Sequence, residues 1–333
     1  MKKLFATKET GIFLLLLLLC ILGQSFNHQF LSAVNVSNLL NQVGMFGIFS
    51  IGMGLVIITG GIDLSVGSVM ALQGVLLGIM LSDKHWPWPL ALLLSILLCV
   101  ALGFFHGFLI TKVRLQPFIV TLCGLLFYRG AARFVTNDET KGFGEAVGFE
   151  GIQSFLTGKI AGVPTSFVLL LLISVVMWIL LHRSVYGRYL FAAGRNEDAA
   201  RYSGINTRAV ISGAYVILGF LTAISGLLFA FYTNSVQPSA HANSYELYGV
   251  AAAVLGGCSL RGGEGSIIGI IFGTILLIVL QNLVNLLGIP SSLNFAVMGA
   301  VILLGVLADS VLKNRQPRAV QVPETAVAAP NSA

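Results

Sequence analysis

Long runs of apolar residues, separated by short polar connections, dominate the chain. A helix that crosses a lipid bilayer needs roughly 20 mostly apolar residues. Stretches of about this kind occur at residues 11–26, 39–60, 62–81, 89–110, 117–135, 164–181, 209–232, 247–260, 266–287 and 293–312. The eighth is short and rich in glycine. The pattern therefore predicts about ten membrane spans.

The composition extends this prediction to the whole molecule. Of its 333 residues, 56% are hydrophobic and 10% are charged, whereas a soluble globular protein carries about 25% charged residues. So few charges cannot cover a surface that faces water, and most of the exterior must therefore face lipid. The sequence predicts an all-α, polytopic transmembrane helical bundle embedded in the bilayer.

The basic residues indicate how this bundle is oriented. With the N-terminus placed in the cytoplasm, 14 of the 19 lysines and arginines fall on the cytoplasmic side, as the positive-inside rule requires. They are Lys2, Lys3, Lys8, Lys112, Arg114, Arg183, Arg188, Arg195, Arg201, Arg208, Arg261, Lys313, Arg315 and Arg318. An even number of spans places the C-terminus in the cytoplasm too. The net charge of +6 thus reflects the basic residues of the cytoplasmic loops, and it is not interpreted as affinity for nucleic acid.

The two ends of the chain differ from the bundle. The first segment is similar to a secretory signal, with basic residues before a leucine-rich core, but it lacks a clean small-residue cleavage site. We expect an uncleaved first helix, with a removed signal as the alternative. Residues 314–333 are rich in Pro and Ala and predict a disordered cytoplasmic tail.

The stretch TGGIDLSVGS, residues 59–68, is unusually polar for its apolar surroundings. Polar groups inside a bilayer need partners or a wet cavity. The glycines let the helix break, and Asp63 or Ser65 can then cap the next helix with a side-chain oxygen. We expect a conformational element near the inner mouth of a pathway. Its residues are Gly60, Gly61, Asp63, Ser65 and Gly67. The alternatives are a plain helix-hairpin turn and a proton-coupling site at Asp63.

A second glycine-rich junction, LGGCSLRGGEGS at residues 255–266, falls on the same side of the membrane. Paired glycine-interrupted segments point to a substrate pathway in transporters. The two junctions do not occupy equivalent places in a five-plus-five inverted repeat, so they are not interpreted as evidence of internal symmetry.

The longest charged cytoplasmic loop contains a pattern typical of a short displayed helix. Asn196 can cap the first free N–H groups, two acids then follow at the positive end of the helix dipole, and Gly204 can end the helix in a left-handed turn. A short capped helix in such a loop suits docking into a groove of another protein. The residues concerned are Asn196, Glu197, Asp198, Ala199, Ala200, Arg201 and Gly204.

This loop carries a specific family resemblance. DAARYSG, residues 198–204, resembles the EAA-x-x-x-G coupling loop of ABC importer permeases, with Asp198 in the glutamate position. Together with TGGIDLSVGS, LQPFIVTL (residues 115–122) and LGGCSLRGGEGSIIG, it is similar to the ribose-type monosaccharide permeases. The likeness runs from about Val36 to Asp309. The chain departs from the pattern at Asp198 and in having no I-x-L-P ending after the loop.

The resemblance implies a bacterial inner-membrane subunit whose permease domain is residues 1–313, with the coupling loop at 183–208. It implies a dimer of permeases, formed with a second copy or a paralogue, around a central path. The expected partners are a double-headed ABC ATPase, whose cleft would receive Asn196–Gly204, and a periplasmic sugar-binding protein that delivers the solute.

The chain itself lacks the residues that catalysis would require. It contains no G-x-x-x-x-G-K-[ST] phosphate-binding loop, so ATP would be hydrolysed by another polypeptide. It shows no nucleophile–base–acid set, and its five histidines have no metal-ligand spacing. We therefore predict no enzymatic activity, no metal site and no cofactor.

Neutral amides and one aromatic side chain are the candidates for the substrate path. Amides can exchange hydrogen bonds with a hydroxyl-rich solute, and residues 281 and 285 lie one helical turn apart. The alternative is that these amides bond to each other between helices. The candidates are Asn41, Gln42, Phe118, Gln281, Asn282, Asn285 and Asn294.

A rival function is an ion-coupled secondary transporter of a small polar solute. Such a protein would need charged residues within the membrane. Apart from Asp63, Arg129 and Arg133, all near span ends, the predicted helices are nearly free of charge. The coupling-loop pattern therefore favours the importer.

Overall fold

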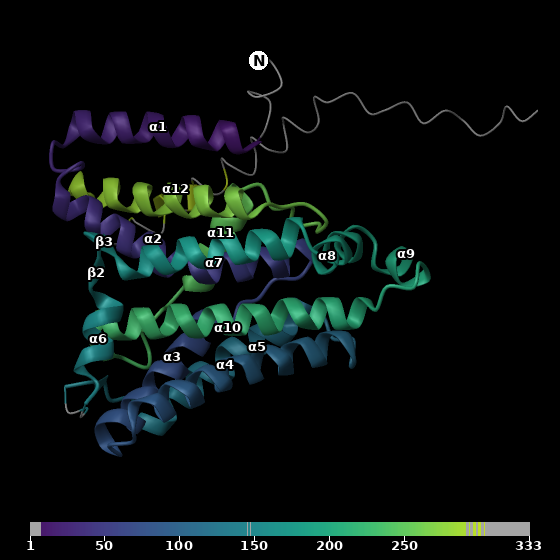
Figure 1. Ribbon diagram of the computed structural model, residues 1–333, viewed down its shortest axis with the longest axis horizontal. Coiled ribbons are helices and arrows are strands. Elements are labelled where there is room, and N and C mark those ends of the chain that lie inside the picture. Colours follow the sequence, from purple (N-terminus) through teal and green to yellow (C-terminus); the bar gives the residue numbers. More distant parts are fainter. Residues whose placement is uncertain are drawn as a thin grey trace, which may run out of the picture.

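The computed structural model describes residues 8–290 apart from 145 and 147, and a few isolated positions between 293 and 303. In this part of the chain, long helices run side by side along one axis (Figure 1). They are α1 (Lys8–Phe26), α2 (Ala33–Ile58), α3 (Val66–Gly78), α4 (Trp88–Thr111), α5 (Pro117–Thr136), α7 (Thr165–His182), α10 (Thr207–Thr233) and α12 (Ile267–Leu286). The shorter α11 (Tyr245–Leu255) lies among them.

Smaller elements close the two ends of the bundle. At one end lie α6 (Glu150–Thr157) and four two-residue strands (Figure 1). Here β1 (Lys141–Gly142) pairs antiparallel with β4 (Ser235–Val236), and β2 (Lys159–Ile160) pairs with β3 (Val163–Pro164). A π-helical turn, η2 (Ile79–Asp83), extends α3. At the opposite end, α8 (Val185–Arg195) and α9 (Glu197–Tyr202) project beyond the bundle.

The helical class predicted from the sequence is confirmed. Among the described residues, seven helices are long and apolar enough to cross a membrane. These seven helices coincide with seven of the expected apolar stretches. Helix α1, which is not among the seven, coincides with the first expected stretch, at residues 11–26. The tenth expected span, at 293–312, and the tail at 314–333 lie almost wholly outside the described residues.

Two expected spans have different bounds from those predicted. The eighth was expected over residues 247–260, but α11 has 11 residues, or about 16 Å at 1.5 Å per residue, against a hydrocarbon core of about 30 Å. The third was expected from residue 62, but α3 begins at Val66. The structure thus shortens α11 at its C-terminal end and α3 at its N-terminal end.

Local chemistry explains several helix boundaries. The Ser32 hydroxyl accepts from the Asn35 N–H at 3.3 Å at the start of α2, and the Ser266 hydroxyl accepts from the Gly269 N–H at 3.0 Å at the start of α12. Pro117 occupies the first turn of α5, where its missing N–H is not needed. These caps replace hydrogen bonds that the first turn of a helix cannot make within itself.

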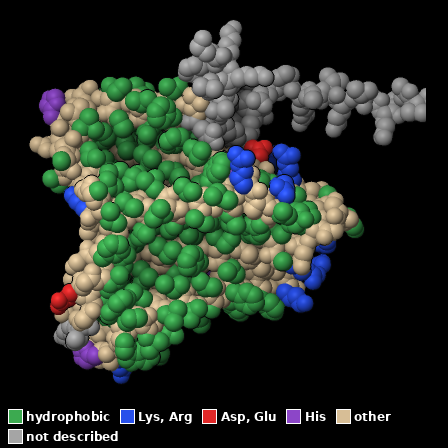
Figure 2. Space-filling model, viewed as in Figure 1, with side chains coloured by type: hydrophobic (Ala, Val, Ile, Leu, Met, Phe, Trp, Pro, Cys, Tyr) green, Lys and Arg blue, Asp and Glu red, His purple; other side chains and the backbone are tan. Residues whose placement is uncertain are grey.

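The centre of the bundle is α2. Every residue from Val43 to Ile58 is buried, as expected for a helix that is apolar on all sides. Helices α7, α10, α11 and α12 pack around it. By contrast, α4, α5 and α7 turn many large apolar side chains outward, including Leu93, Phe127 and Leu172. Figure 2 shows apolar side chains covering the flank of the bundle, as a lipid-facing surface requires.

Helices α4 and α10 approach each other most closely at glycines. A Cβ atom added at Gly103 would meet the backbone carbonyl of Tyr215, and one at Gly107 would lie 2.9 Å from the Cα of Ser212. On the facing side, a Cβ at Gly219 would lie 2.5 Å from the Cys99 carbonyl oxygen. Small residues spaced four apart allow such contact between membrane helices, which here brings α4 against α10.

Gly103→Ala is expected to destabilise the protein by about 1–3 kcal/mol, because the added methyl group forces two backbones apart. Gly130→Ala on α5 is the matched control, since nothing lies within 4 Å of its added Cβ. This control should be neutral or stabilising, because Gly in a helix interior is less stable than Ala by roughly 0.5–1 kcal/mol. Thermal unfolding in mild detergent measures both, and equal melting temperatures would contradict this packing.

Candidate functional site

The polar junction between α2 and α3 is a stretch of non-helical backbone within the bundle. Helix α2 ends at Ile58, Gly60 takes the left-handed conformation with φ +85°, and α3 begins at Val66. The Gly61 N–H donates to the Val56 carbonyl at 3.1 Å, and the Thr121 hydroxyl of α5 donates to the Ile62 carbonyl at 3.2 Å. The helix thus breaks where the sequence predicts, and its loose backbone groups find partners.

Asp63 stabilises the turn itself and does not cap α3 as predicted. Its Oδ1 accepts from the Ser65 N–H at 2.7 Å and from the Ser65 hydroxyl at 2.6 Å. The Ser65 side chain makes no capping hydrogen bond to the helix, because its hydroxyl is used on the carboxylate. Both side chains are buried, with 3% and 2% exposure.

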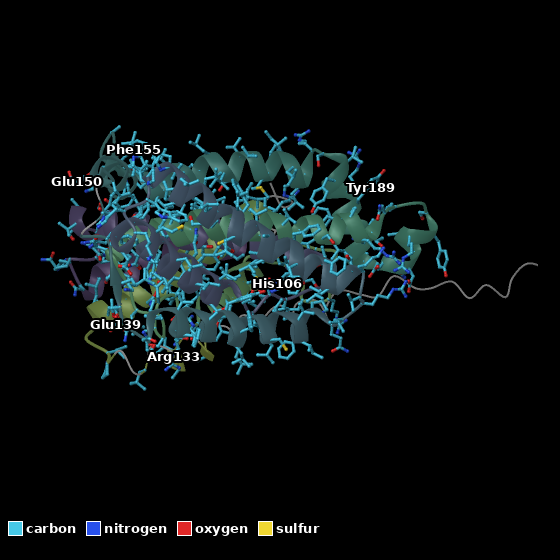
Figure 3. The ribbon with its side chains drawn as sticks, turned by 90° about the horizontal axis from the view of Figure 1, so that it is seen from below. His106, Arg133, Glu139, Glu150, Phe155 and Tyr189 are labelled. Carbon is cyan, nitrogen blue, oxygen red and sulfur yellow. The ribbon has the colours of Figure 1, made fainter. Side chains whose placement is uncertain are left out.

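A buried relay of three side chains ties this turn to two further helices. Asp63 Oδ2 lies 3.4 Å from Nδ1 of His106 on α4. His106 Nε2 lies 2.8 Å from the hydroxyl of Tyr128 on α5. His106 is 2% exposed and Tyr128 is 4% exposed, and Figure 3 places His106 in the interior of the bundle. Because each imidazole nitrogen faces a different partner, the ring links α4 and α5 to the junction.

The second glycine-rich junction packs directly against the first. The Gly263 N–H donates to the Ile58 carbonyl at 2.8 Å, which gives the last residue of α2 a partner. Gly194 of α8 also approaches here, since a Cβ atom on it would meet the Ile58 carbonyl and lie 2.7 Å from the Gly263 nitrogen. The two glycine-rich segments and α8 therefore form one contact, which the sequence did not reveal.

The other broken helix, α11, presents an acid to the start of α3. Glu246 is 7% exposed, and its carboxyl group packs against the backbone at Gly67. A Cβ atom on Gly67 would lie 2.6 Å from Glu246 Oε2, which explains the glycine. Arg129 of α5 donates to the carbonyls of Pro238 (3.0 Å) and His241 (2.7 Å), in the turn that precedes α11.

His241 is held in this turn as a neutral ring. Its side chain is 6% exposed and packs on Phe229, with ring centroids 4.6 Å apart. Burial, and then the positive charge of Arg129, lower the pKa of His241 to about 3.

The short helix predicted in the charged loop is present as α9. The Asn196 side chain accepts from the Ala199 N–H at 2.9 Å, and Gly204 takes φ +86° after the helix. Glu197 is held by Arg201 at 2.6 Å and by the Thr207 hydroxyl at 3.2 Å. The side chain of Asp198 is 77% exposed, and Tyr202 is 91% exposed. Of the two acids of α9, Glu197 is therefore held by side chains of α9 and α10, whereas Asp198 is more freely displayed.

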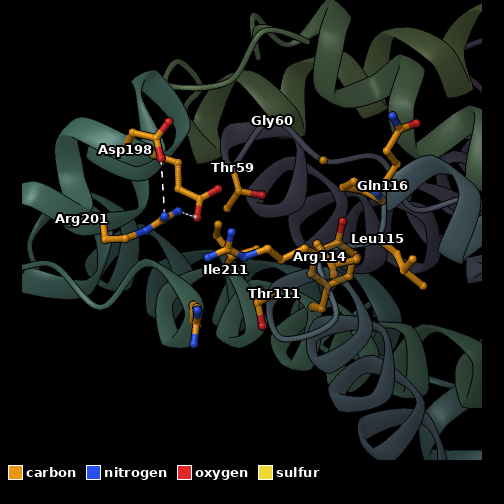
Figure 4. Close-up of a pocket in the computed structure, with 15 residues that line it drawn as sticks. Thr59, Gly60, Thr111, Arg114, Leu115, Gln116, Asp198, Arg201 and Ile211 are labelled. Carbon is orange, nitrogen blue, oxygen red and sulfur yellow. Dashed lines mark hydrogen bonds and ion pairs between the residues drawn. The ribbon is translucent and has the colours of Figure 1, made fainter.

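A pocket of about 400 Å³ lies between α9 and the α2–α3 junction. Figure 4 shows Asp198 and Arg201 on one side of it and Gly60, Arg114 and Gln116 across from them. We call it the inner pocket. Tyr215 of α10 also lines it. Lys and Arg side chains gather on the surface at this end of the bundle (Figure 2).

The amides predicted for the substrate path are scattered. Asn282 and Asn35 exchange two hydrogen bonds, at 2.7 and 3.0 Å, between α12 and α2. Asn41 accepts from the Ser166 hydroxyl at 2.5 Å. These contacts match the alternative of bonding between helices. Gln42 and Gln281 are half-buried, Asn285 is exposed, Phe118 is 52% exposed, and Asn294 lies outside the described residues.

Sequence reasoning missed His106, Tyr128, Arg129 and Glu246 as parts of the site. One signal was present: His106 stands between two glycines four apart in the otherwise apolar α4. A polar side chain in the middle of a membrane helix needs a partner, but the sequence does not say that the partner is Asp63.

The fold and the site define a multi-pass membrane protein with broken helices in its interior and a basic end that displays a short helix. Residues 35–306 match the family described as "Branched-chain amino acid transport system / permease component". The chain belongs to this permease family. It is thus the permease component of a binding-protein-dependent ABC importer in the bacterial cell membrane, and ATP hydrolysis belongs to another subunit.

Several known permeases are similar to the chain over most of its length. It is 40% identical to the ribose import permease protein RbsC of Bacillus subtilis, over 91% of this chain and 92% of that one. It is 36% identical to RbsC of Escherichia coli K12, over 92% and 95%. It is 32% identical to the xylose transport system permease protein XylH of Escherichia coli K12, over 86% and 87%. These findings confirm the predicted resemblance, whereas no solved structure matches.

Tyr128→Phe is expected to lower stability by about 1–3 kcal/mol, because it leaves the buried His106 Nε2 without a partner. Asp63→Asn removes the charge at the other end of the relay. Since both act through the same imidazole, the double variant should deviate from additivity by about 0.5–3 kcal/mol in thermal or denaturant unfolding. Tyr232→Phe, at a tyrosine that is 45% exposed, is the control. Strict additivity would show that the relay is not a unit.

Stability should fall as the pH drops below about 6.5, through His241. The unfolded chain takes up a proton near the ordinary histidine pKa of about 6.5, whereas the folded protein resists it down to a pKa of about 3. Because the unfolded state binds more protons in that window, the loss reaches about 2 kcal/mol at pH 5. His241→Gln should flatten the melting temperature between pH 7 and pH 5. An unchanged slope in that variant would contradict the neutral buried ring.

Proposed function

We propose that the chain forms the membrane path of an ATP-driven importer for an aldopentose, a sugar of the ribose or xylose type. The printed names of its relatives support the sugar class. One arrangement carries the proposal: α9 and the α2–α3 junction line the same inner pocket. A force applied to α9 from outside therefore acts next to the broken helix in the interior.

Helix α9 is the proposed docking element for a double-headed ATPase. Its displayed face carries Asp198 and Tyr202, while Ala200 is buried and Glu197 bonds to the Thr207 hydroxyl of α10. Gly204 and Asn206 join it directly to α10, whose N-cap is Asn206. Closure of the ATPase around α9 would thus move the start of α10 and the inner pocket. Asn196, Asp198 and Gly204 would act here through the shape and charge of the helix.

The position of α9 also suggests how the protein is oriented in the membrane and where its partners bind. The end that carries α9 and the basic side chains would face the cytoplasm, together with both chain termini, in a bundle of about ten spans. A periplasmic binding protein would deliver the sugar at the opposite end, which carries α6 and the strands. A second copy of this chain, or a paralogue, would complete the path. Residues 1–313 would form the permease domain and 314–333 a cytoplasmic tail.

One observation favours ion coupling as a second candidate: the buried Asp63–His106 pair. Carboxylates and imidazoles inside membrane helices often mark proton pathways. In this chain, however, the carboxylate is held by three groups of its own structure. A transport assay without ATP separates the two functions.

Asp198→Lys is expected to abolish uptake while leaving the protein folded, because it reverses the charge on the displayed face of α9. The measurement is ATP-dependent uptake of labelled ribose and xylose into vesicles that contain the permease and its ATPase, with the binding protein supplied. Co-purification of the ATPase is measured in parallel.

Glu150→Lys is the matched control, since Glu150 is exposed at the opposite end, in the first turn of α6. It should retain the ATPase. Full uptake by the Asp198→Lys variant would overturn the docking role. Uptake that needs no ATP would favour the ion-coupled transporter, and failure of both pentoses to enter or compete would overturn the sugar class.

A further inference from the structure

The inner pocket carries more positive charge on its wall than its own acids balance. Three arginines line it, Arg114, Arg201 and Arg208. Arg201 is paired with both acids of the wall, at 2.6 Å from Glu197 and 3.5 Å from Asp198. Among the residues that the structure describes, Arg114 and Arg208 have no hydrogen-bond or ion-pair partner. The pocket therefore holds two cationic side chains without a counter-charge.

The three arginines come from separate elements that meet at the pocket. Arg114 lies in the connection between α4 and α5 and takes φ +65°, a left-handed conformation that is uncommon for residues other than glycine. Arg201 belongs to α9, and Arg208 is the second residue of α10. Figure 4 shows the side chains of Arg114 and Arg201 extending toward one another across the pocket. Because like charges repel, this arrangement favours an anion between them.

The ends of two helices add to the positive field. Gln116 is the N-cap of α5 and Pro117 its first residue, and both line the pocket. The first turn of α10 contributes Arg208. The N-terminus of a helix carries a partial positive charge, and its free N–H groups suit anions. Two long helices thus begin at the wall that holds the unpaired arginines.

The size and the other polar groups of the pocket narrow the class of anion. A phosphate monoester carries a charge of about −1.5 to −2 at pH 7 and can balance two arginines, whereas a carboxylate balances one. The Gln116 amide makes no hydrogen bond within the described ranges, and the carboxylates of Glu197 and Asp198 can accept further bonds from hydroxyl groups. The volume of about 400 Å³ is typical of a small-molecule site.

We propose that the inner pocket binds a small phosphorylated polyol of the sugar phosphate class. Its phosphate group lies at the unpaired arginines, and its hydroxyl groups face Gln116 and the acids of α9. Such a compound forms when a separate kinase transfers a phosphoryl group from ATP to a hydroxyl of an imported sugar, which also yields ADP. The ligand is therefore the first phosphorylated product of the proposed cargo.

Binding at this place would inhibit further uptake. A ligand that contacts Arg114 and Arg201 ties α9 to the connection between α4 and α5, and so resists the movement that an ATPase imposes on α9. Accumulated sugar phosphate would then slow the importer that supplies its precursor. This regulatory part rests on the proposed function, whereas the binding itself does not.

Binding is tested on the full-length permease in mild detergent at low salt, with ribose 5-phosphate as the probe. Calorimetry should show that ribose 5-phosphate binds, that inorganic phosphate binds more weakly, and that neutral ribose does not bind. Arg114→Gln and Arg208→Gln should each weaken the binding by about tenfold or more, because each removes a charge-assisted contact. Arg188→Gln is the matched control, since Arg188 is exposed in α8 and does not line the pocket.

Three results would overturn the proposal. Equal affinity for ribose and ribose 5-phosphate, or unchanged affinity in both pocket variants, would show that the pocket is not a phosphate site. Tighter binding of ADP than of ribose 5-phosphate would exclude the sugar phosphate class. Stabilisation by phosphatidylglycerol vesicles alone, lost in the same two variants, would assign the arginines to a lipid headgroup.

The regulatory part is tested in vesicles that hold the permease with its ATPase. Ribose 5-phosphate is enclosed with ATP on the side that carries α9, and labelled ribose is supplied outside with the binding protein. Uptake should fall as the probe concentration rises, and Arg114→Gln should need about tenfold more probe, each protein being compared with its own uptake without probe. Inhibition that is unchanged in Arg114→Gln overturns the regulation. Binding of the probe without any uptake of pentose supports the site and counts against the proposed function.

Discussion

Backbone that leaves a helix inside a lipid bilayer must satisfy its N–H and C=O groups without help from bulk water. In this permease the constraint falls on residues 59–65, between α2 and α3. Each neighbouring segment supplies a partner to this stretch. Gly263 donates to the last carbonyl of α2, Thr121 donates to the Ile62 carbonyl, and Asp63 accepts from Ser65. The break is therefore possible only where these segments converge.

The same constraint shapes the surrounding helices. For His106 to reach Asp63, α4 has to lie close to α10 and α5, and glycines at 103, 107 and 219 allow that approach. Tyr128 then satisfies the far nitrogen of the imidazole. The carboxylate in the turn needs His106, and His106 in turn needs Tyr128. The packing of α4, α5 and α10 is therefore tied to one non-helical turn. A change at any of these glycines thus acts on the polar relay as well as on packing.

What the sequence could predict follows from which interactions are local. A membrane helix satisfies its own backbone, so an apolar run of sufficient length was enough to locate α2, α4, α5, α7, α10 and α12. The cap at Asn196 and the left-handed Gly204 are local as well, and α9 was predicted correctly. Asp63 was recognised as a residue that needs a partner. Its partner His106 lies 43 residues further along the chain. In the contact between Glu246 and Gly67, the two residues lie on two different helices, α11 and α3. No periodicity encodes such pairings.

The length of α11 shows a different limit. Apolar residues continue past its end at Leu255, so hydropathy extended the expected span to residue 260. The helix ends there because Gly257 takes φ +93° and the Cys258 N–H donates to the Ala253 carbonyl at 2.9 Å, as in a glycine cap at a helix C-terminus. The local conformation of the glycines, not the hydropathy of the stretch, decides the boundary.

The buried charges are consistent with a path for a neutral solute. Asp63 precedes α3 and Glu246 stands in the first turn of α11. Both acids lie near the positive end of the helix dipole that begins beside them, and both are buried. Asp63 is held by Ser65 and His106, and the Glu246 carboxyl group packs against the backbone at Gly67. Both carboxyl groups are therefore occupied by contacts within the protein fold. A sugar without charge can pass such groups without being held, and its selection then depends on hydroxyl and shape recognition elsewhere in the complex.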